Sequence, residues 1–178
     1  MSEPVLIISG PPGVGKTTVA ALLAQRSSAG VHLESDQFFH FISAGYVEPW
    51  KPESHGQNTV VMGVVAAAAA GYADAGYSTT IEGIVSPRWF LEPLCAALER
   101  SGHAVAYPVL RAPLAVCIQR AESRAAQPLT NASVIEQLWR EFAELGAFER
   151  HVLDAGDRSP DELADEIELR VMEGKLSV

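Results

Sequence analysis

The strongest constraint on this chain is an eight-residue loop near its N-terminus, which reads Gly10, Pro11, Pro12, Gly13, Val14, Gly15, Lys16 and Thr17. The loop matches the pattern G-x-x-x-x-G-K-[ST] and lies between an apolar run at 5–9 and a helical pattern at 17–26. Glycines let the backbone wrap closely around a ligand, so that several N–H groups and the positive end of the helix face one anion. A chance glycine-rich turn is the alternative, but it does not explain the matching strand and helix patterns. The loop therefore predicts a phosphate-binding site between a buried strand and a helix.

Three side chains of this segment have expected roles at a bound nucleotide. The ammonium group of Lys16 is expected to reach the β- and γ-phosphates, and the Thr17 hydroxyl is expected to bind Mg²⁺. Thr18 follows directly and is expected to contact the nucleotide together with the loop. ATP and Mg²⁺ are therefore the expected cofactors.

The size and composition of the chain fit one globular domain spanning residues 1–178. Of its 178 residues, 48% are hydrophobic and 20% are charged, which suffices for a full core and leaves little room for a second one. The formal net charge of −9 disfavours nucleic acid or an anionic membrane as a partner, because those surfaces recruit Lys and Arg. The sequence carries no signal of the oligomeric state.

Three further features favour a cytoplasmic protein. The N-terminus has no basic segment before its apolar run and does not resemble a secretory signal. The apolar stretch from Val60 to Ala73 is shorter than the roughly 20 residues of a membrane span, so we interpret it as a buried helix. Cys95 and Cys117 lie in apolar surroundings without metal-ligand spacing, which is typical of free core cysteines in a reducing compartment.

Strand and helix patterns alternate along the rest of the chain. We expect strands at 5–9, 31–34, 77–81, 104–110 and 151–154, and helices at 17–26, 58–75 and 88–100 and after Pro113, Ser133 and Ser159. The alternation predicts right-handed βαβ crossovers, and hence an α/β fold, a three-layer α/β/α sandwich with a five-stranded parallel sheet. Ligands of such sheets bind beyond the carboxyl ends of the strands, so the functional residues are expected there.

The last two helices begin with recognisable caps. The segment from Ser133 to Glu136 predicts a capping box, and the helix behind it would place Val134, Leu138, Phe142 and Leu145 on one face. Ser159 predicts the other cap, with a proline at the first helical position and acidic residues in the first turn. Both patterns indicate helices with defined starting points.

The loop, an aspartate after the second strand and an Arg-x-x-x-Arg pattern in the helix after the fourth together resemble the P-loop small-molecule and nucleotide kinases. Chloramphenicol phosphotransferase-like, zeta-toxin-like and shikimate/gluconate kinase-like proteins are similar families. The resemblance covers most of the chain as topology and implies a P-loop NTPase fold of the nucleoside monophosphate kinase-like kind. It also implies ATP-dependent transfer of the γ-phosphoryl group to a hydroxyl of a small molecule.

Two carboxylates lie at positions where the similar kinases carry functional acidic residues. Asp36 follows the second strand, where the similar kinases carry the aspartate that accepts the proton of the attacking hydroxyl; the alternative is a helix cap. Glu82 ends the third strand, where an acidic residue lies near the magnesium. It stands in place of the usual aspartate, so the expectation is a bond to a magnesium-bound water, with a structural hydrogen bond as the alternative.

The resemblance also implies a lid at about 118–133 and an adenine loop. Arg120 and Arg124 are four residues apart on one helix face, where the similar kinases carry arginines that neutralise the transferred phosphoryl group. The alternative is a solvated basic stripe that pairs with Glu122 or Glu136. Gly156, in the loop after the fifth strand, is the expected main-chain contact of the adenine.

The segment 37–58 is interpreted as an insertion that binds the phosphoryl acceptor, because it gathers aromatic residues in a chain that is only 7% aromatic. The substrate-binding candidates are Phe38, Phe39, Trp50, Lys51, Asn58 and Arg88. For each aromatic residue the alternative is ordinary core packing. Arg88 either pairs with an anionic acceptor or is an exposed arginine at a helix start.

Three other functions remain open from the residues. One is a nucleotide-dependent regulatory ATPase, in which Asp36 orients water or caps a helix. Another is a zeta-toxin-like kinase of a nucleotide sugar. A nucleoside monophosphate kinase ranks last, because it needs arginines for the acceptor phosphate and the segment 37–58 has none.

Overall fold

The computed structural model describes residues 3–123 and 131–178. Its strands are β1 (Val5–Ile8), β2 (Gly30–Glu34), β3 (Ser78–Glu82), β4 (Val105–Ala106), β5 (Val109–Arg111) and β6 (Val152–Asp154). Its α-helices are α1 (Lys16–Arg26), α2 (Ser35–Phe39), α3 (His55–Asp74), α4 (Leu91–Arg100), α5 (Leu114–Glu122), α6 (Ala132–Arg140) and α7 (Pro160–Met172). Short 3₁₀ helices cover η1 (Pro52–Ser54) and η2 (Gly146–His151).

The sheet is parallel and is interrupted at one point. Four strands follow the order β2-β3-β1-β4, and β5 pairs with β6 in a separate two-stranded sheet. The two sheets are joined where Ser9, just after β1, donates its N–H to Pro108 and accepts from Leu110 at 2.8 Å. The expectation of one five-stranded sheet with an unbroken strand at 104–110 is therefore corrected. Pro108 lacks the N–H of a ladder residue, and Tyr107 donates its own to Leu176 instead.

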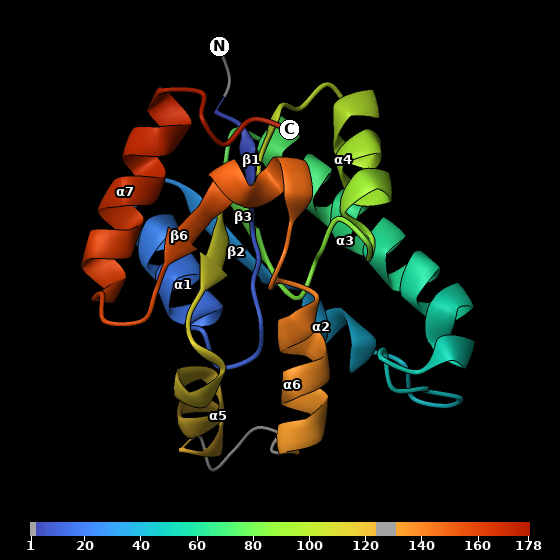
Figure 1. Ribbon diagram of the computed structural model, residues 1–178. Helices are drawn as coiled ribbons and strands as arrows, with labels where there is room; N and C mark the ends of the chain where they lie inside the picture. Colours follow the sequence, from blue (N-terminus) through green and yellow to red (C-terminus); the bar gives the residue numbers. More distant parts are fainter. Residues whose placement is uncertain (1–2, 124–130) are drawn as a thin grey trace.

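The helices cover both faces of the sheet, which confirms the three-layer architecture (Figure 1). Successive strand residues point to opposite faces, so Ile7 packs in the core cluster of α3 and α4, whereas Ile8 packs in that of α1 and α7. Helices α5 and α6 lie beyond the carboxyl ends of the strands (Figure 1). This edge of the sheet is where the sequence predicts the functional site.

Several helix boundaries differ from the expected ones. Helix α3 begins three residues earlier than expected, and α4 begins at Leu91 because Phe90, at its N-cap, has a left-handed φ of 62°. Helix α6 is capped by the Asn131 side chain, which accepts from the N–H of Ser133, so the expected capping box at Ser133 is wrong. The cap at Ser159 is confirmed, including the reciprocal bond from Glu162.

The expected face of α6 is corrected as well. The helix ends at Arg140, so Phe142 and Leu145 lie beyond it, although both are buried in the core with the α3 and α4 residues. The two cysteines are buried and free, as expected, and burial raises the pKa of the Cys95 thiol to about 11. Among the helices that the structure describes, none is long and apolar enough to cross a membrane.

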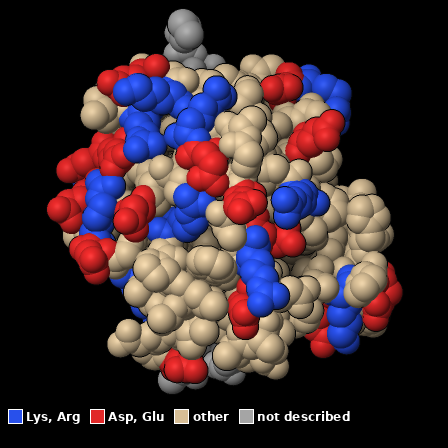
Figure 2. Space-filling model, viewed as in Figure 1, with Lys and Arg blue, Asp and Glu red and all other residues tan. Residues whose placement is uncertain are grey.

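Ion pairs join α7 to α1. Arg26 of α1 contacts Asp161, Asp165 and Glu168 at 2.7–3.1 Å. Figure 2 shows acidic and basic residues intermixed over α7 and the C-terminal segment, whereas the surface over α5 and α6 carries fewer charges. Because these pairs are largely exposed, each contributes little to stability, and the apolar face of α7 holds the helix in place.

Candidate active site

The loop after β1 has the backbone that a phosphate cradle requires. Gly10, Gly13 and Gly15 all have positive φ angles, of 144°, 76° and 106°. A Cβ atom at Gly10 would lie 2.2 Å from the Leu110 carbonyl oxygen, and one at Gly13 would lie 2.2 Å from that of Cys117. Both positions therefore exclude any side chain, and the loop is pressed against β5 and α5.

Lys16 and Thr17 lie where the loop enters α1. Lys16 Nζ donates to the Pro11 carbonyl oxygen at 3.0 Å, so its side chain folds back over the loop. The Thr17 hydroxyl donates to Glu82 Oε1 at 3.0 Å. Thr18 is exposed in the first turn of α1, next to the loop. The first helical turn and the end of β3 thus meet through one hydroxyl–carboxylate contact.

Glu82 is a buried carboxylate at the carboxyl end of β3, only 5% exposed. Burial raises its pKa, opposed by the charge of Lys16 and the Thr17 hydroxyl, and the charges of Asp36 and Glu34 add to the rise. The structural hydrogen bond considered for Glu82 is present. Its oxygen and the Thr17 hydroxyl are also both hard ligands of the kind that Mg²⁺ prefers. Within the described residues no cluster of three or more His, Cys, Asp or Glu side chains would hold a metal, so phosphate oxygens and waters would supply the remaining ligands.

Asp36 is exposed in the first turn of α2, directly after β2. It does not cap that helix, because the N-cap position belongs to Glu34. Helix α2 is fixed against β3 by the buried Ser35, whose Oγ would be 2.0 Å from a Cβ atom at Gly83. Gly83 therefore lets α2 approach the end of β3, which brings Asp36 within electrostatic reach of Glu82.

Arg120 of α5 lies between the phosphate loop and the loop after β6. Its guanidinium group donates to the carbonyl oxygens of Ala155 at 3.0 Å and Gly156 at 2.7 Å, with a longer contact of 3.5 Å to that of Val14. The alternative, in which Arg120 pairs with Glu122 or Glu136, is not found among the described residues, where Glu136 binds Arg140. Arg120 thus joins α5, the phosphate loop and the loop after β6. Arg124 and the tip of the expected lid lie outside the described residues.

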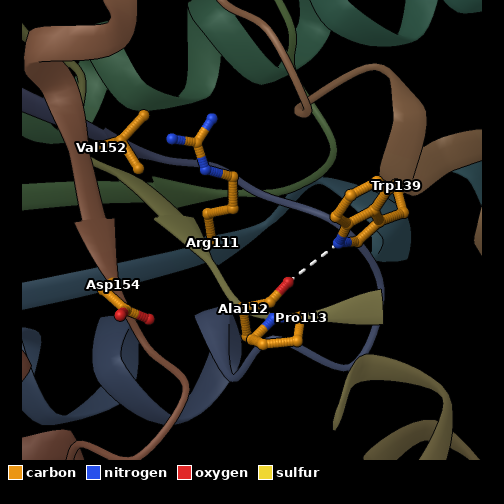
Figure 3. Close-up of a pocket in the computed structure, with 6 residues that line it drawn as sticks. All are labelled: Arg111, Ala112, Pro113, Trp139, Val152 and Asp154. Atoms are coloured by element: carbon orange, nitrogen blue, oxygen red, sulfur yellow. Dashed lines mark hydrogen bonds between the residues drawn. The ribbon is translucent and has the colours of Figure 1, made fainter. Parts of the chain in front are cut away.

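A hollow of about 300 Å³ opens beside the loop that carries Gly156. Its lining comes from the ends of β5 and β6 and from α6, and consists of Arg111, Ala112, Pro113, Trp139, Val152 and Asp154. In Figure 3 the Trp139 indole lies over the end of β5, where its Nε1 donates to the Ala112 carbonyl oxygen at 2.9 Å. Asp154 lines the hollow and also accepts from the N–H of Gly156 at 2.9 Å, so the hollow lies next to the expected adenine loop. Sequence reasoning missed Trp139, because its pattern shows only an amphipathic helix.

The aromatic segment after Asp36 folds into a short helix and a strap, which we define as residues 45–54. Gln57 fixes the strap to α3 by bonding both the N–H and the carbonyl oxygen of Val47. The Asn58 amide donates to Pro49, and Ser54 Oγ donates to Pro49 and Lys51. These hydrogen bonds therefore hold the strap in a defined conformation against α3.

The proposed substrate candidates take different positions around this strap. Phe39 is 3% exposed and belongs to the core, as the packing alternative had it, while Phe38 is partly buried and meets the Phe41 ring edge-on at 5.8 Å. Trp50 is half-buried, and Lys51 pairs with Glu48 at 2.8 Å.

The two remaining candidates are Asn58 and Arg88. Asn58 is buried, and its Oδ1 is without a hydrogen-bond partner among the described residues. Arg88 is exposed before α4 and lines a second hollow together with Glu141 and Glu144.

Two aromatic residues of the loop after β3 were not foreseen. Phe90 stacks on His55, with ring centroids 5.6 Å apart, and meets the Trp89 ring edge-on at 4.9 Å. The positive φ of Phe90 is unfavourable for an aromatic residue, so the contacts around it hold the loop in this conformation. No local signal predicted this, because an aromatic residue normally avoids the left-handed region.

Comparison with known proteins identifies the class of this arrangement. A family model described as an AAA domain matches residues 5–145, so the chain belongs to that family. The match spans the phosphate loop, Asp36, Glu82 and Arg120. No curated protein matches the sequence significantly.

The similar solved structures include a resistance protein and two kinases. The tunicamycin resistance protein of Deinococcus radiodurans is 23% identical over 95% of each chain, with a TM-score of 0.71. A gluconokinase from Sinorhizobium meliloti 1021 is 14% identical over 98% of this chain and 94% of its own, with a TM-score of 0.69. A sugar kinase from Janibacter sp. HTCC2649 is 23% identical over 96% of this chain and 94% of its own, with a TM-score of 0.66. The chain therefore has the fold of the P-loop small-molecule kinases, which confirms the fold expected from the resemblance.

Replacing Arg120 by alanine is expected to lower the free energy of unfolding by about 1–2 kcal/mol, because charged donors to main-chain carbonyls contribute more than neutral ones. The substitution removes the hydrogen bonds from the Arg120 guanidinium group to the carbonyl oxygens of Ala155 and Gly156. Thermal unfolding of the nucleotide-free protein measures it. Arg140→Ala is the matched control, since Arg140 is exposed and, among the described residues, forms its one ion pair with Glu136 on its own helix. Equal unfolding temperatures for the two variants would show that Arg120 does not hold these loops together.

Proposed function

We propose that this protein is an ATP-dependent phosphotransferase that transfers the γ-phosphoryl group to a hydroxyl of a small molecule. The observation that carries the proposal is the meeting of three groups at one sheet edge. The phosphate loop, the Thr17–Glu82 pair and the Asp36 carboxylate all lie at the carboxyl ends of β1, β3 and β2. The groups that would bind Mg·ATP and the carboxylate that would accept the hydroxyl proton thus lie within one site.

The phosphate loop and Lys16 would bind the β- and γ-phosphates. Main-chain N–H groups of 10–17 and the N-terminus of α1 favour negative charge at this position. Thr17 and Glu82 would hold Mg²⁺ or its water. When bound with ATP, the ion supplies positive charge across the β- and γ-phosphates.

Asp36 would act on the acceptor. Its carboxylate is exposed and close enough to Glu82 to affect its pKa, so it lies near the phosphate end of the site. In the transfer, the acceptor hydroxyl oxygen bonds to the γ-phosphorus as the bond between that phosphorus and the ADP oxygen breaks, and the hydroxyl proton passes to Asp36. The products are ADP and a phosphate monoester.

Arg120 and the Gly156 loop would serve the nucleotide. The bonds of Arg120 to this loop place its positive charge between the phosphate loop and the expected adenine site. From there Arg120 would neutralise phosphate charge, and the sequence pattern suggests the same role for Arg124, which lies outside the described residues. The hollow beside Gly156 supports a base-binding region at this end of the sheet.

The preformed strap supports a kinase over a regulatory ATPase. An enzyme that only hydrolyses ATP needs no binding surface for an organic acceptor. In the proposed kinase, the segment 37–58 would supply that surface, and hydrogen bonds to α3 hold part of it in place. The net charge of −9 supports a small molecule as the acceptor over nucleic acid or a membrane surface.

A screen of hydroxylated metabolites and antibiotics tests the proposal. The protein is incubated with Mg·ATP and each compound, and mass spectrometry detects the gain of one phosphate. We expect at least one acceptor to be phosphorylated, and calorimetry to show binding of a non-hydrolysable ATP analogue. Binding and hydrolysis of ATP without any phosphorylated compound would favour the regulatory ATPase.

A further inference from the structure

We propose that Ser9 is a positioning residue for phosphoryl transfer, because its buried hydroxyl ties the start of the phosphate loop to the segment 82–85, against which the helix of Asp36 packs. The inference rests on the proposed kinase function. It concerns a residue that acts through other residues of the site and not on the substrates themselves.

Ser9 lies directly before the phosphate loop and is fully buried. Its Oγ accepts from the Val85 N–H at 2.9 Å and donates to the carbonyl oxygen of Val85 at 2.7 Å or of Gly83 at 3.1 Å. The strand before it is apolar, and burying a hydroxyl is costly unless the hydroxyl is hydrogen-bonded. The bonds to the loop after β3 therefore explain why a hydroxyl occupies this core position.

The segment that this hydroxyl holds also contacts both sides of the site. On the nucleotide side, Glu82 accepts from the Thr17 hydroxyl at the start of α1. On the acceptor side, Gly83 lies against α2, since a Cβ atom at Gly83 would be 2.0 Å from Ser35 Oγ. Asp36 is the next residue of α2. A shift of Gly83 would therefore move Asp36 relative to the phosphate loop.

Tyr107 attaches the same segment to the core by a separate bond. Its hydroxyl donates to the Val85 carbonyl oxygen at 2.6 Å, and the side chains of Tyr107 and Val85 are both fully buried. Removing the Ser9 hydroxyl thus leaves the loop after β3 attached to the core but without this link to the phosphate loop. The expected consequence is a folded protein in which Asp36 is poorly placed, and a displacement of about 1 Å can slow a reaction by roughly 10²-fold.

Hydrogen exchange of the nucleotide-free protein tests the link without an acceptor. In Ser9→Ala the Val85 N–H loses its hydrogen-bond partner, so the segment 83–90 is expected to exchange about 10-fold faster or more. Thr79→Val is the matched control. Thr79 is a buried residue near the amino end of β3, and its hydroxyl donates to the Tyr77 carbonyl oxygen at 3.1 Å. This variant also loses a side-chain hydrogen bond, but exchange of 83–90 should stay at the wild-type rate.

Turnover and nucleotide affinity test the role in transfer. With Mg·ATP and an acceptor found in the screen, Ser9→Ala is expected to lower kcat by about 10- to 100-fold. Calorimetry should show an affinity for Mg²⁺ and a non-hydrolysable ATP analogue within about two-fold of the wild type, because the glycines and Lys16 of the loop are unchanged. Thr79→Val should alter neither value.

A double-mutant cycle distinguishes positioning from a general loss of stability. In the Asp36→Asn background, Ser9→Ala should change turnover by less than about two-fold, because the base that it positions is already lost. If Ser9→Ala does not fold, Ser9→Cys replaces it throughout, since a thiol keeps the approximate size but forms weak hydrogen bonds.

Unchanged kcat and exchange in the Ser9 variant would overturn the positioning role. A loss of kcat that is as large in the Asp36→Asn background, or as large in Thr79→Val, would also overturn it. Failure of the wild type to bind the ATP analogue, or to phosphorylate any acceptor, would instead overturn the proposed function, and the positioning role with it.

Discussion

Replacing Lys16 by alanine is expected to reduce phosphoryl transfer by roughly 10³-fold, because the variant loses the ammonium group that meets the developing charge on the phosphates. The fold should survive, since Lys16 lies where the loop enters α1 and is outside the buried core, and its hydrogen bond to the Pro11 carbonyl oxygen lies within the loop. Turnover with Mg·ATP measures the effect, and circular dichroism with thermal unfolding measures the fold.

Lys175→Ala is the matched control for this variant. Lys175 is exposed at the C-terminal end of the chain, where it pairs with Glu173 at 2.8 Å. Its loss should leave turnover at the wild-type level. If Lys16→Ala also retained turnover, the loop at 10–17 would not be the phosphate site, and the assignment of ATP as the donor would fall with it.

Replacing Asp36 by asparagine is expected to lower phosphorylation of the acceptor by roughly 10²-fold or more, while the affinity for Mg·ATP stays close to that of the wild type. The amide keeps the shape of the side chain but cannot take the hydroxyl proton. Nucleotide binding should persist because it depends mainly on the phosphate loop and on the Thr17–Glu82 pair, whose hydroxyl–carboxylate bond does not involve Asp36. Calorimetry with a non-hydrolysable analogue beside a turnover assay separates the two effects.

The control for this variant is Asp165→Asn, an exposed carboxylate of α7 that pairs with Arg26. It should change neither binding nor turnover. Unchanged turnover of Asp36→Asn would remove Asp36 from the mechanism. A parallel loss of nucleotide affinity would place it in the magnesium shell instead.

The phosphate loop was predictable because its information is local. Three glycines with positive φ, the lysine and the hydroxyl follow one another in a fixed pattern, and the apolar run before them predicts the strand. The cap at Ser159 is of the same kind, since both of its hydrogen bonds join residues three apart. Such short-range features are determined by neighbouring residues and not by the rest of the fold.

The features that the sequence did not predict depend on residues far apart in the chain. The break of the fourth strand at Pro108 was readable in principle, but the bond from Tyr107 to Leu176 depends on where the C-terminus folds. Asn131 and Ser133 are both good caps, and the one that acts is decided by packing of the helix. Likewise, the partners of Arg120 are more than thirty residues away from it.

On the acceptor side, too, some features were predictable from the local sequence and others were not. The density of aromatic residues at 37–58 predicted a binding segment, but not which of them face solvent. Phe39 packs in the core and Phe41 is exposed, although the two are only two residues apart. The catalytic and binding roles of the candidate residues stay predictions, with positions that the structure now defines.

The central claim is that the γ-phosphoryl group leaves ATP for an organic hydroxyl. ATP labelled with oxygen-18 on the γ-phosphoryl group tests it most directly, with any acceptor found in the screen. We predict that the label appears in a phosphate monoester of the acceptor, at a rate that falls by roughly 10²-fold or more in Asp36→Asn and by roughly 10³-fold in Lys16→Ala. Label recovered only in inorganic phosphate, at the same rate in wild type and Asp36→Asn, would contradict the account.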